Sequence, residues 1–429
     1  MTKPLYNLTA SEAVAKLVGG EITAEALLRA CLERIDEREA DVGAWIYLNR
    51  DQALDTARTL DRSPRRGLLH GIPVGLKDII DTADMPTAYG SLIYHSHRPA
   101  MDAACVHALR AAGAVLLGKT VSTEFAYRRA GKTSNPHDRR HSPGGSSSGS
   151  AAAVADRMVP LALGTQTAGS VIRPAAYCGV FGLKPTFNVF SFAGVRHLAE
   201  SFDTLGGMAN SLDDLALLRA AVLGVAPRPV ARDGAAPRIG FCRTAFWDDG
   251  QPAMRATLEE IARRLAKAGA TVVDLKLGFD EQATLDACWT VTKFEGARTV
   301  GYDRVHHPEG ISAAARALVD EGNAIPFDAY LDAQRLLDRM RARLEADFEG
   351  FDAVLTPSSA GEAPAGLSDT GPVMFNHLWT IAYTPALTVP AGKGPNGLPL
   401  GLQLVARRYQ DDRLLDVASW VCTKLGPQI

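Results

Sequence analysis

Cysteine is scarce in this sequence, and no two of its six cysteines form a Cys-x-x-Cys pair. In a chain of 429 residues, such wide spacing argues against a disulfide framework and against a zinc site built from paired cysteines. We therefore expect reduced thiols, which are typical of a cytoplasmic protein.

A large excess of charge is also missing. The net charge is -2 at pH 7, and lysines and arginines form no clustered stripe, so the composition gives no electrostatic footprint for nucleic acid. No window holds the roughly 18 apolar residues that a membrane-spanning helix needs, and the N-terminus lacks the apolar run of a signal peptide. We expect a cytoplasmic protein with no membrane partner and no direct nucleic-acid partner.

Two common ligand-binding motifs are absent as well. The sequence has neither the GxxxxGK[ST] phosphate loop nor the HExxH zinc motif. We expect neither a metal nor an organic cofactor.

The pattern of apolar residues indicates the fold class. From about residue 70, short apolar strands such as "GIPVGLKDI" and "VPLALGT" alternate with helical segments such as "SGSAAAVAD". The first fifty residues predict helices, the first of them with the capping-box pair Thr9 and Glu12. Alternation of this kind predicts an α/β fold with a large mixed, mostly parallel β-sheet flanked by helices on both faces.

The segment "VAPRPVARDGAAPR", residues 225–238, is typical of a surface connection between two halves of a sequence. Strands are predicted on both sides of it, and they could complete one sheet. We therefore predict a single domain over residues 1–429. Its catalytic core would span about 65–215, and the half from about 237 to 429 would complete the sheet and the substrate pocket.

The stretch "HSPGGSSSGSAAAVA", residues 141–155, allows three interpretations. Glycine and serine runs are often flexible linkers, but this one is short and leads directly into a predicted helix. It also matches GxSxG, the nucleophile turn of α/β-hydrolases, with Ser147 as the nucleophile. That turn must follow a strand directly, and Pro143 with the charges before it argues against one.

The third interpretation depends on two further segments. Lys77 lies inside the apolar strand "GIPVGLKDII", and Ser170 lies in the small-residue turn of "GTQTAGS". Taken alone, the lysine would be an exposed edge residue and the serine part of a tight turn. Together with the serines near Ser146 they suggest a catalytic set.

These three segments resemble the motifs of the amidase signature family, in the order and spacing of that family. The segments are "GIPVGLKD", "GGSSSGS" and "GTQTAGS". The resemblance implies an enzyme that cleaves a small carboxamide or urea-type C–N bond to a carboxylate and ammonia or an amine. It makes Ser170 the nucleophile that forms an acyl-enzyme, Ser146 the bridging serine and Lys77 the terminal base.

The resemblance also implies details of the site. The Gly145–Ser146 peptide bond would be cis, and backbone N–H groups would form an oxyanion hole. The residues that supply them are Thr167, Ala168, Gly169 and Ser170. Lysine can act as a base only when it is neutral, and burial among apolar neighbours such as Val74 and Leu76 is what lowers the pKa of an amine.

The sequence departs from the family pattern at two positions that bear on the substrate. Gln166 stands where the family usually has Asp, and Arg173 lies three residues after Ser170 where the usual arginine lies two after it. Arg128 or Arg129 is a candidate to bind a carboxylate on the substrate, because the guanidinium matches that group with two hydrogen bonds. Alternatively, the segment that contains Arg128 and Arg129 is a solvated loop with no role in binding.

Tyr127 and His377 are further candidates for the pocket. The family also leaves a second function open, the glutaminase (A) subunit of a tRNA-dependent amidotransferase, which acts with an ATP-dependent partner. It leaves room for a homodimer as well.

Overall fold

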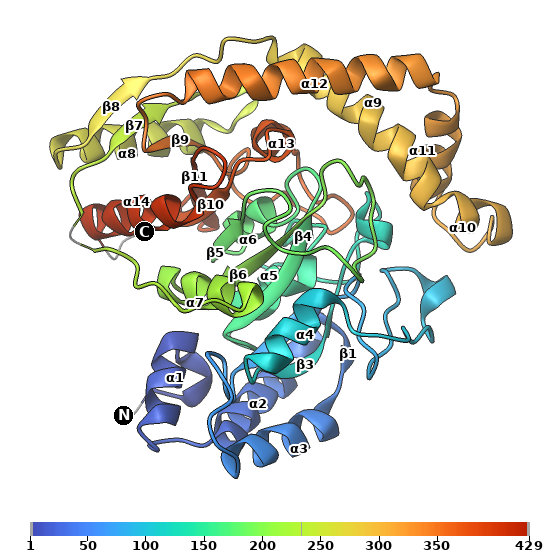
Figure 1. Ribbon diagram of the computed structural model, residues 1–429, viewed down its shortest axis with the longest axis vertical. Helices are drawn as coiled ribbons and strands as arrows, with labels where there is room; N and C mark the ends of the chain where they lie inside the picture. The colour runs from blue at the N-terminus through green and yellow to red at the C-terminus, as the bar shows by residue number, and fades with distance from the viewer. Residues whose placement is uncertain (1–2, 233, 427–429) are drawn as a thin grey trace.

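The structure is a computed structural model that describes residues 3–232 and 234–426. Its centre is one eleven-stranded sheet with the strand order β1-β3-β2-β4-β6-β5-β10-β11-β9-β7-β8. The sheet is mixed and carries helices on both faces (Figure 1). The predicted α/β class is confirmed.

The described residues form the following elements. The strands are β1 (Trp45–Leu48), β2 (Pro73–Lys77), β3 (Val115–Thr120), β4 (Leu161–Gln166), β5 (Phe181–Lys184), β6 (Thr204–Ala209), β7 (Arg238–Phe241), β8 (Thr271–Asp274), β9 (Ala353–Pro357), β10 (Ala386–Lys393) and β11 (Pro399–Val405). The α-helices are α1 (Ala10–Val18), α2 (Ala24–Val42), α3 (Arg50–Asp61), α4 (Ala104–Ala111), α5 (Ser148–Ala155), α6 (Ile172–Tyr177), α7 (Leu212–Leu223), α8 (Pro252–Lys267), α9 (Glu281–Thr299), α10 (Gly301–His306), α11 (Ala313–Asn323), α12 (Phe327–Asp347), α13 (Met374–Ile381) and α14 (Asp411–Leu425). Short 3-10 turns are η1 (Leu5–Asn7), η2 (Leu92–Tyr94), η3 (Glu124–Ala126) and η4 (Trp247–Asp249).

The share of parallel strands is lower than the sequence suggests. Within the described chain, β2 pairs in parallel with β3 and β4, and β7 pairs in parallel with β8 and β9. The other six strand pairs are antiparallel. Strands β10 and β11 are joined by a short turn, which permits only antiparallel pairing. The alternation of strands and helices in the sequence does not reveal which strands are joined in this way.

Local signals at the helix ends agree with the sequence. Thr9 and Glu12 form the predicted capping box at the start of α1, and Gly224 ends α7 in the left-handed conformation, with φ 66°. The first fifty residues contain one strand that was not expected. Residues Trp45–Leu48 pair antiparallel with β3, and a run of four apolar residues is too short to reveal this.

The two halves of the sequence meet inside the sheet. Strand β5 of the first half pairs with β10 of the second, with Leu183 opposite Leu387. The sheet is therefore continuous between the described parts of both halves, and one domain over residues 1–429 stays a prediction. The predicted connection 225–238 runs from α7 to β7 and contains residue 233, which lies outside the described residues.

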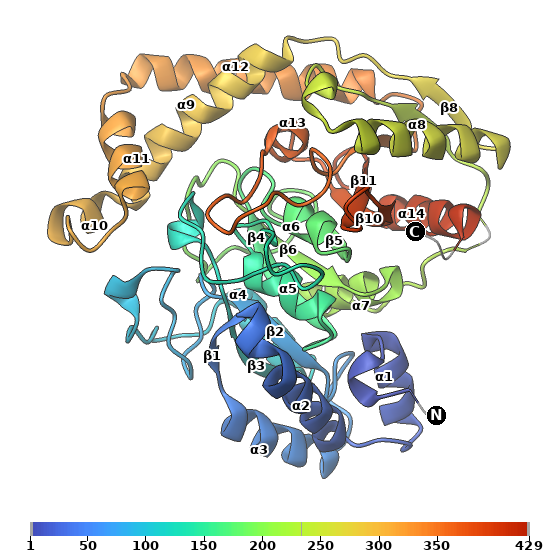
Figure 2. The same cartoon turned by 180° about the vertical axis from the view of Figure 1, so that it is seen from behind.

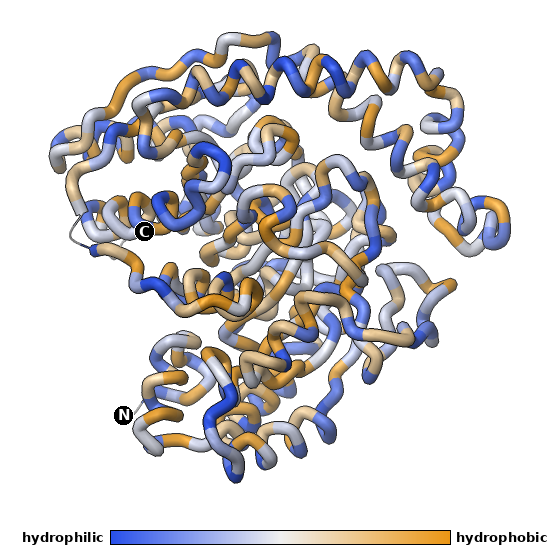
Figure 3. The backbone as a smooth tube through the Cα atoms, viewed as in Figure 1, coloured by the Kyte–Doolittle hydropathy of each residue, from blue (hydrophilic) through white to orange (hydrophobic). Residues whose placement is uncertain are grey.

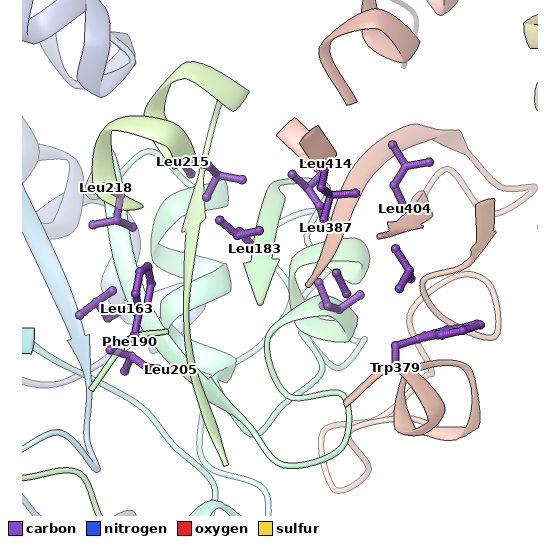
Figure 4. Close-up of a cluster of buried hydrophobic side chains, with 14 of the residues drawn as sticks. Leu163, Leu183, Phe190, Leu205, Leu215, Leu218, Trp379, Leu387, Leu404 and Leu414 are labelled. Carbon is purple, nitrogen blue, oxygen red and sulfur yellow. The ribbon is translucent and has the colours of Figure 1, made fainter. Parts of the chain in front are cut away.

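The core is built from apolar side chains between the sheet and its helices. Helices α7 and α14 pack on one face, and α2, α5 and α6 pack on the other (Figures 1 and 2). Figure 4 shows Leu215 and Leu218 of α7 beside Leu163, Leu183 and Leu205 of the strands, all buried. The outer helix α12 alternates between hydrophilic and hydrophobic residues, as expected for a helix with one solvent face (Figure 3).

The sheet brings the predicted catalytic segments together. Strands β2 and β4 are parallel neighbours, with Leu76 opposite Leu163. Lys77 is the last residue of β2, and the turn that carries Ser170 follows β4. Ligands of open α/β sheets bind beyond the carboxyl ends of the strands. This edge is therefore where a site is expected. None of the helices in the described part of the chain is long and apolar enough to cross a bilayer.

Candidate active site

Lys77 is fully buried at the carboxyl end of β2. Its Nζ donates to Ser146 Oγ at 2.6 Å and to Thr165 Oγ1 at 2.8 Å. Burial lowers the pKa of Lys77 to about 7, and the negative charge of Asp203 opposes the shift. A large share of Lys77 is therefore neutral near pH 7 and able to accept a proton.

Ser146 lies in the loop before α5, and its peptide bond with Gly145 is cis, as the family resemblance implies. Residues 142–154 are all buried, which rules out a flexible linker. The nucleophile-turn interpretation of Ser147 is also wrong, because no strand precedes it. The Ser147 hydroxyl instead donates to Thr165 O and accepts from Thr165 N, both at 3.2 Å.

Ser170 lies in the turn between β4 and α6. The backbone of this turn is held by its carbonyl oxygens, since Ser147 N donates to Ser170 O at 3.4 Å and Arg173 N donates to Gly169 O at 2.9 Å. The four N–H groups predicted for the oxyanion hole have no acceptor in the described part of the chain. They belong to Thr167, Ala168, Gly169 and Ser170.

Residue 169 must be glycine, because Asn376 leaves no room for a Cβ atom at this position. A Cβ placed on it would lie 2.5 Å from Asn376 Oδ1. Asn376 of α13 therefore packs directly against the backbone beside Ser170, an arrangement that no local motif reveals.

Gln166, one of the departures from the family, holds the start of α6. Its Oε1 accepts from Val171 N at 2.9 Å and Ile172 N at 3.0 Å, and its Nε2 donates to Thr380 Oγ1 at 2.8 Å. Free N–H groups at a helix start need such an acceptor. Gln166 supplies it without adding a charge.

Arg173, the second departure, is buried close to the two serines. Its Nη2 donates to Gly145 O at 2.5 Å and to Thr370 Oγ1 at 3.2 Å, while Nε and Nη1 have no partner. No carboxylate of the described residues lies within ion-pair distance of it. Burial lowers the pKa of Arg173 to about 10, and the negative charge of Asp369 is among the effects that oppose the shift. The guanidinium stays charged at neutral pH.

One cavity of about 390 Å³ joins these groups. Ser146, Ser170 and Arg173 line it together with Thr167 and Ala168 of the turn. The remaining lining comes from the 126–128 segment, from Leu198, from α9, from the loop before α13 and from α13 itself. Those residues are Ala126, Tyr127, Arg128, Leu198, Trp289, Thr292, Ser368, Asp369, Thr370, Gly371, Pro372, Val373 and His377.

The structure separates the pocket residues predicted from the sequence. Tyr127, Arg128 and His377 line the cavity, but Arg129 does not. The Arg129 guanidinium lies 3.6 Å from the carboxylate of Glu124. The Arg128 guanidinium lies over the rings of Tyr127 and Trp289, at 5.7 Å and 5.5 Å from their centroids.

His377 lines the cavity with a neutral imidazole ring. Burial lowers its pKa to about 3, and the charge of Arg173 adds to the shift. Its Nδ1 has no partner in the described chain, and its ring meets Trp289 edge to face at 5.1 Å. It can therefore offer a hydrogen bond to a ligand.

Sequence reasoning missed Thr165 and Asp203. The Thr165 hydroxyl is the second acceptor of a hydrogen bond from Lys77 Nζ, and Asp203 accepts a 2.5 Å hydrogen bond from Thr167 Oγ1. Thr165 lies in the quoted segment "GTQTAGS", but nothing local in that segment pairs it with Lys77, and Asp203 lies outside the three quoted segments. Among residues 3–232 and 234–426, no three His, Cys, Asp or Glu side chains are grouped so that they could hold a metal ion.

The sequence profile of the family described as Amidase matches residues 26–415. The chain belongs to the amidase signature family. The prediction of an enzyme that cleaves amide C–N bonds is thereby confirmed at the level of the family.

Individual relatives within the family differ in what they do. The chain is 34% identical to the A subunit of glutamyl-tRNA(Gln) amidotransferase from Chloroflexus aggregans, over 96% of this chain and 95% of that protein. The peptide amidase of Stenotrophomonas maltophilia superposes with a TM-score of 0.86 at 32% identity, covering 97% of both chains. A 6-aminohexanoate cyclic dimer hydrolase gives 0.87 at 25% identity, covering 98% of this chain and 97% of that one.

Proposed function

We propose that this amidase hydrolyses a small amide that carries a carboxylate close to the bond to be cleaved. The observation that carries the proposal is the Arg173 guanidinium, buried beside Ser146 and Ser170 with two nitrogens unpartnered. A buried charge without a partner is costly. A substrate carboxylate in the cavity would place a negative charge close to this guanidinium.

In the proposed reaction, neutral Lys77 takes a proton from Ser146, which takes one from Ser170. Ser170 Oγ bonds to the carbonyl carbon, and the resulting oxyanion accepts from the N–H groups of the 167–170 turn. The C–N bond then breaks as Ser146 returns a proton to the leaving nitrogen. Water attacks the acyl-enzyme by the same proton path and releases the second carboxylate.

The arrangement of charges explains why a small acid suits this cavity. Arg173 lies three residues from Ser170, so a carboxylate held by it sits near the reacting carbonyl. Thr370, which accepts a hydrogen bond from the guanidinium, carries no charge, and Gln166 at the start of α6 is also neutral. Two arginines, Arg128 and Arg173, and one carboxylate, Asp369, line the cavity, so the charge of its lining is net positive next to the nucleophile.

The test is ammonia release from matched pairs of amides, such as malonamate and its neutral methyl ester. The acid should be the better substrate, and Ser170→Ala should cleave neither. Arg173→Gln should raise KM for the acid by roughly 10- to 100-fold, the loss of a charged hydrogen bond worth about 1.5–3 kcal/mol, and change KM for the ester little.

Two controls sharpen this experiment. Arg173→Lys keeps the charge and should restore part of the preference for the acid. Arg129→Ala removes an arginine that does not line the cavity and should leave both KM values unchanged. Equal losses on the acid and the ester in Arg173→Gln would contradict a carboxylate-bearing substrate.

A second candidate function rests on the sequence relatives, several of which are the A subunit of glutamyl-tRNA(Gln) amidotransferase. In that role, the chain would release ammonia from glutamine and pass it to a partner. Co-purification with other subunits and a glutaminase rate that rises on adding them would favour this function. Turnover of a small acid amide by the chain alone would favour the first.

A further inference from the structure

A buried carboxylate lies just behind the turn that carries Ser170. Asp203 immediately precedes β6, whose Thr204 pairs with Gln166 of β4. It is only 4% exposed. The next residue after Gln166 is Thr167, so the sheet register itself places Asp203 beside the turn.

Both carboxylate oxygens of Asp203 are used. Oδ1 accepts from Thr167 Oγ1 at 2.5 Å. Oδ2 accepts from Leu198 N at 2.7 Å and Ala199 N at 3.1 Å, and it lies 3.1 Å from His197 Nδ1. Asp203 thus ties the turn of Ser170 to the loop 197–199, although the two are distant in sequence.

Asp203 also contacts residues that line two different hollows of the surface. Its partners Thr167 and Leu198 line the cavity that holds Ser146 and Ser170. His197, its third partner, lines a second and more open hollow together with Tyr89, Tyr94, Arg196 and other residues. One carboxylate is therefore in contact with walls of both.

The charge of Asp203 reaches Lys77 without a hydrogen bond. Lys77 Nζ donates to two neutral hydroxyls, Ser146 and Thr165. Burial lowers the pKa of Lys77, and the charge of Asp203 is what opposes that shift. The charges of Glu200 in the same loop and of Glu295 of α9 act on His197, and the guanidinium of Arg196 pairs with Asp303.

We infer that Asp203 is a positioning residue of the proposed reaction. Its carboxylate holds Thr167, and with it the turn that carries Ser170, and its negative charge acts on Lys77. The inference rests on the proposed function of Lys77, Ser146 and Ser170. It goes beyond that function because Asp203 touches none of the reacting atoms. A purely structural role, in which Asp203 only fixes the loop 197–199, is the alternative.

The pH profile separates these roles. Asp203→Asn keeps the shape of the side chain but removes the charge that favours protonated Lys77. The acid limb of the rate profile should therefore move to lower pH by at least about half a pH unit. Thr167→Val breaks the hydrogen bond without changing charge, so it should lower the rate several-fold and leave the limb in place.

Two readouts are needed. The first is hydrolysis of the acid amide. The second is reaction with an alkyl fluorophosphonate, in which Ser170 Oγ bonds to phosphorus, fluoride leaves and the proton passes to Ser146. The second reports on the nucleophile whatever the natural substrate is, and peptide mapping locates the adduct.

Asp411→Asn is the matched control. Asp411 is a buried carboxylate whose charge likewise raises the pKa of a buried lysine, Lys184, against the lowering by burial. It accepts from Thr186 and does not line the cavity. Its replacement should leave the acid limb where it is in both readouts.

Each outcome decides between the roles. A shifted limb in Asp203→Asn, with none in Asp411→Asn, supports the inference, whereas lowered rates at every pH with an unmoved limb overturn it. If Asp203→Asn does not fold, Asp203→Glu and Thr167→Val take its place, and a Thr167→Val rate equal to wild type overturns the inference.

Labelling of Ser170 without amide turnover refutes only the proposed substrate, while an unlabelled wild type refutes the proposed nucleophile and this inference with it.

Discussion

Lys77 Nζ lies 2.6 Å from Ser146 Oγ, where the end of β2 meets the residues just before α5. The lysine side chain is fully buried, and within the described chain its Nζ is hydrogen-bonded only to neutral hydroxyl groups. No carboxylate of the described residues forms an ion pair that would stabilise its protonated form. This single relationship turns a side chain that is normally a surface cation into a candidate base.

The first prediction concerns the rate against pH. Because burial lowers the pKa of Lys77 to about 7, kcat should rise as pH increases through about 7 and then level off. The measurement is kcat for an amide substrate between pH 5 and 9. A rate that is flat across this range, or that falls through pH 7, would contradict Lys77 as the base.

The second prediction concerns stability against pH. A lysine in the unfolded chain keeps its proton up to about pH 10.5, whereas folded Lys77 loses it near 7. Between these values the unfolded state binds more protons, so Lys77 makes the free energy of unfolding rise with pH. Urea denaturation should show that wild type gains stability relative to Lys77→Met from pH 7 to 10. Parallel curves would show that burial does not perturb Lys77.

A third prediction follows from the close approach of Gly169 and Asn376. Gly169→Ala would place Cβ 2.5 Å from Asn376 Oδ1, so the turn must move and kcat should fall at least 10-fold, since small displacements of reacting groups are costly. Asn376→Ala in the same chain removes Oδ1, the nearest atom, and leaves the Cβ of residue 376 at 3.0 Å. Partial recovery of kcat in the double variant, relative to Gly169→Ala, is the expected result, and none would mean that the contact is not the cause.

Gln166 supports a fourth prediction, on folding. Gln166→Met leaves the N–H groups of Val171 and Ile172 buried without an acceptor, which should lower the free energy of unfolding by about 2–4 kcal/mol. Thr380→Val removes the partner of Gln166 Nε2 and the hydroxyl that donates to Ala168 O. It leaves the acceptor for Val171 N and Ile172 N in place, so it should cost less. Chemical denaturation of both variants provides the comparison, and the reverse order would refute the assigned role of Gln166.

Much of this molecule is visible in the sequence because its signals are local. The capping box at Thr9, the glycine at the end of α7 and the strands around Lys77 depend on neighbours a few residues away. The catalytic candidates depend on three motifs that are specific only in combination. The cis bond at Gly145–Ser146 came with that resemblance and not from local chemistry.

What the sequence did not reveal depends on contacts between distant segments. Asn376 packs on Gly169 across some 200 residues, and Asp203 reaches Thr167 only because β6 pairs antiparallel with β4. Arg128 and Arg129 are indistinguishable as neighbours in the sequence, yet only Arg128 lines the cavity. Long-range packing decided each of these cases.

The central claim is that Ser170 carries the acyl group. The most direct measurement is mass spectrometry of the enzyme quenched with acid during turnover of an amide or ester substrate, followed by peptide mapping. The account predicts an added mass equal to the acyl group on the peptide that contains Ser170, present in Ser147→Ala and absent in Ser170→Ala. An acyl group on Ser146 or Ser147, or one that persists in Ser170→Ala, would contradict it.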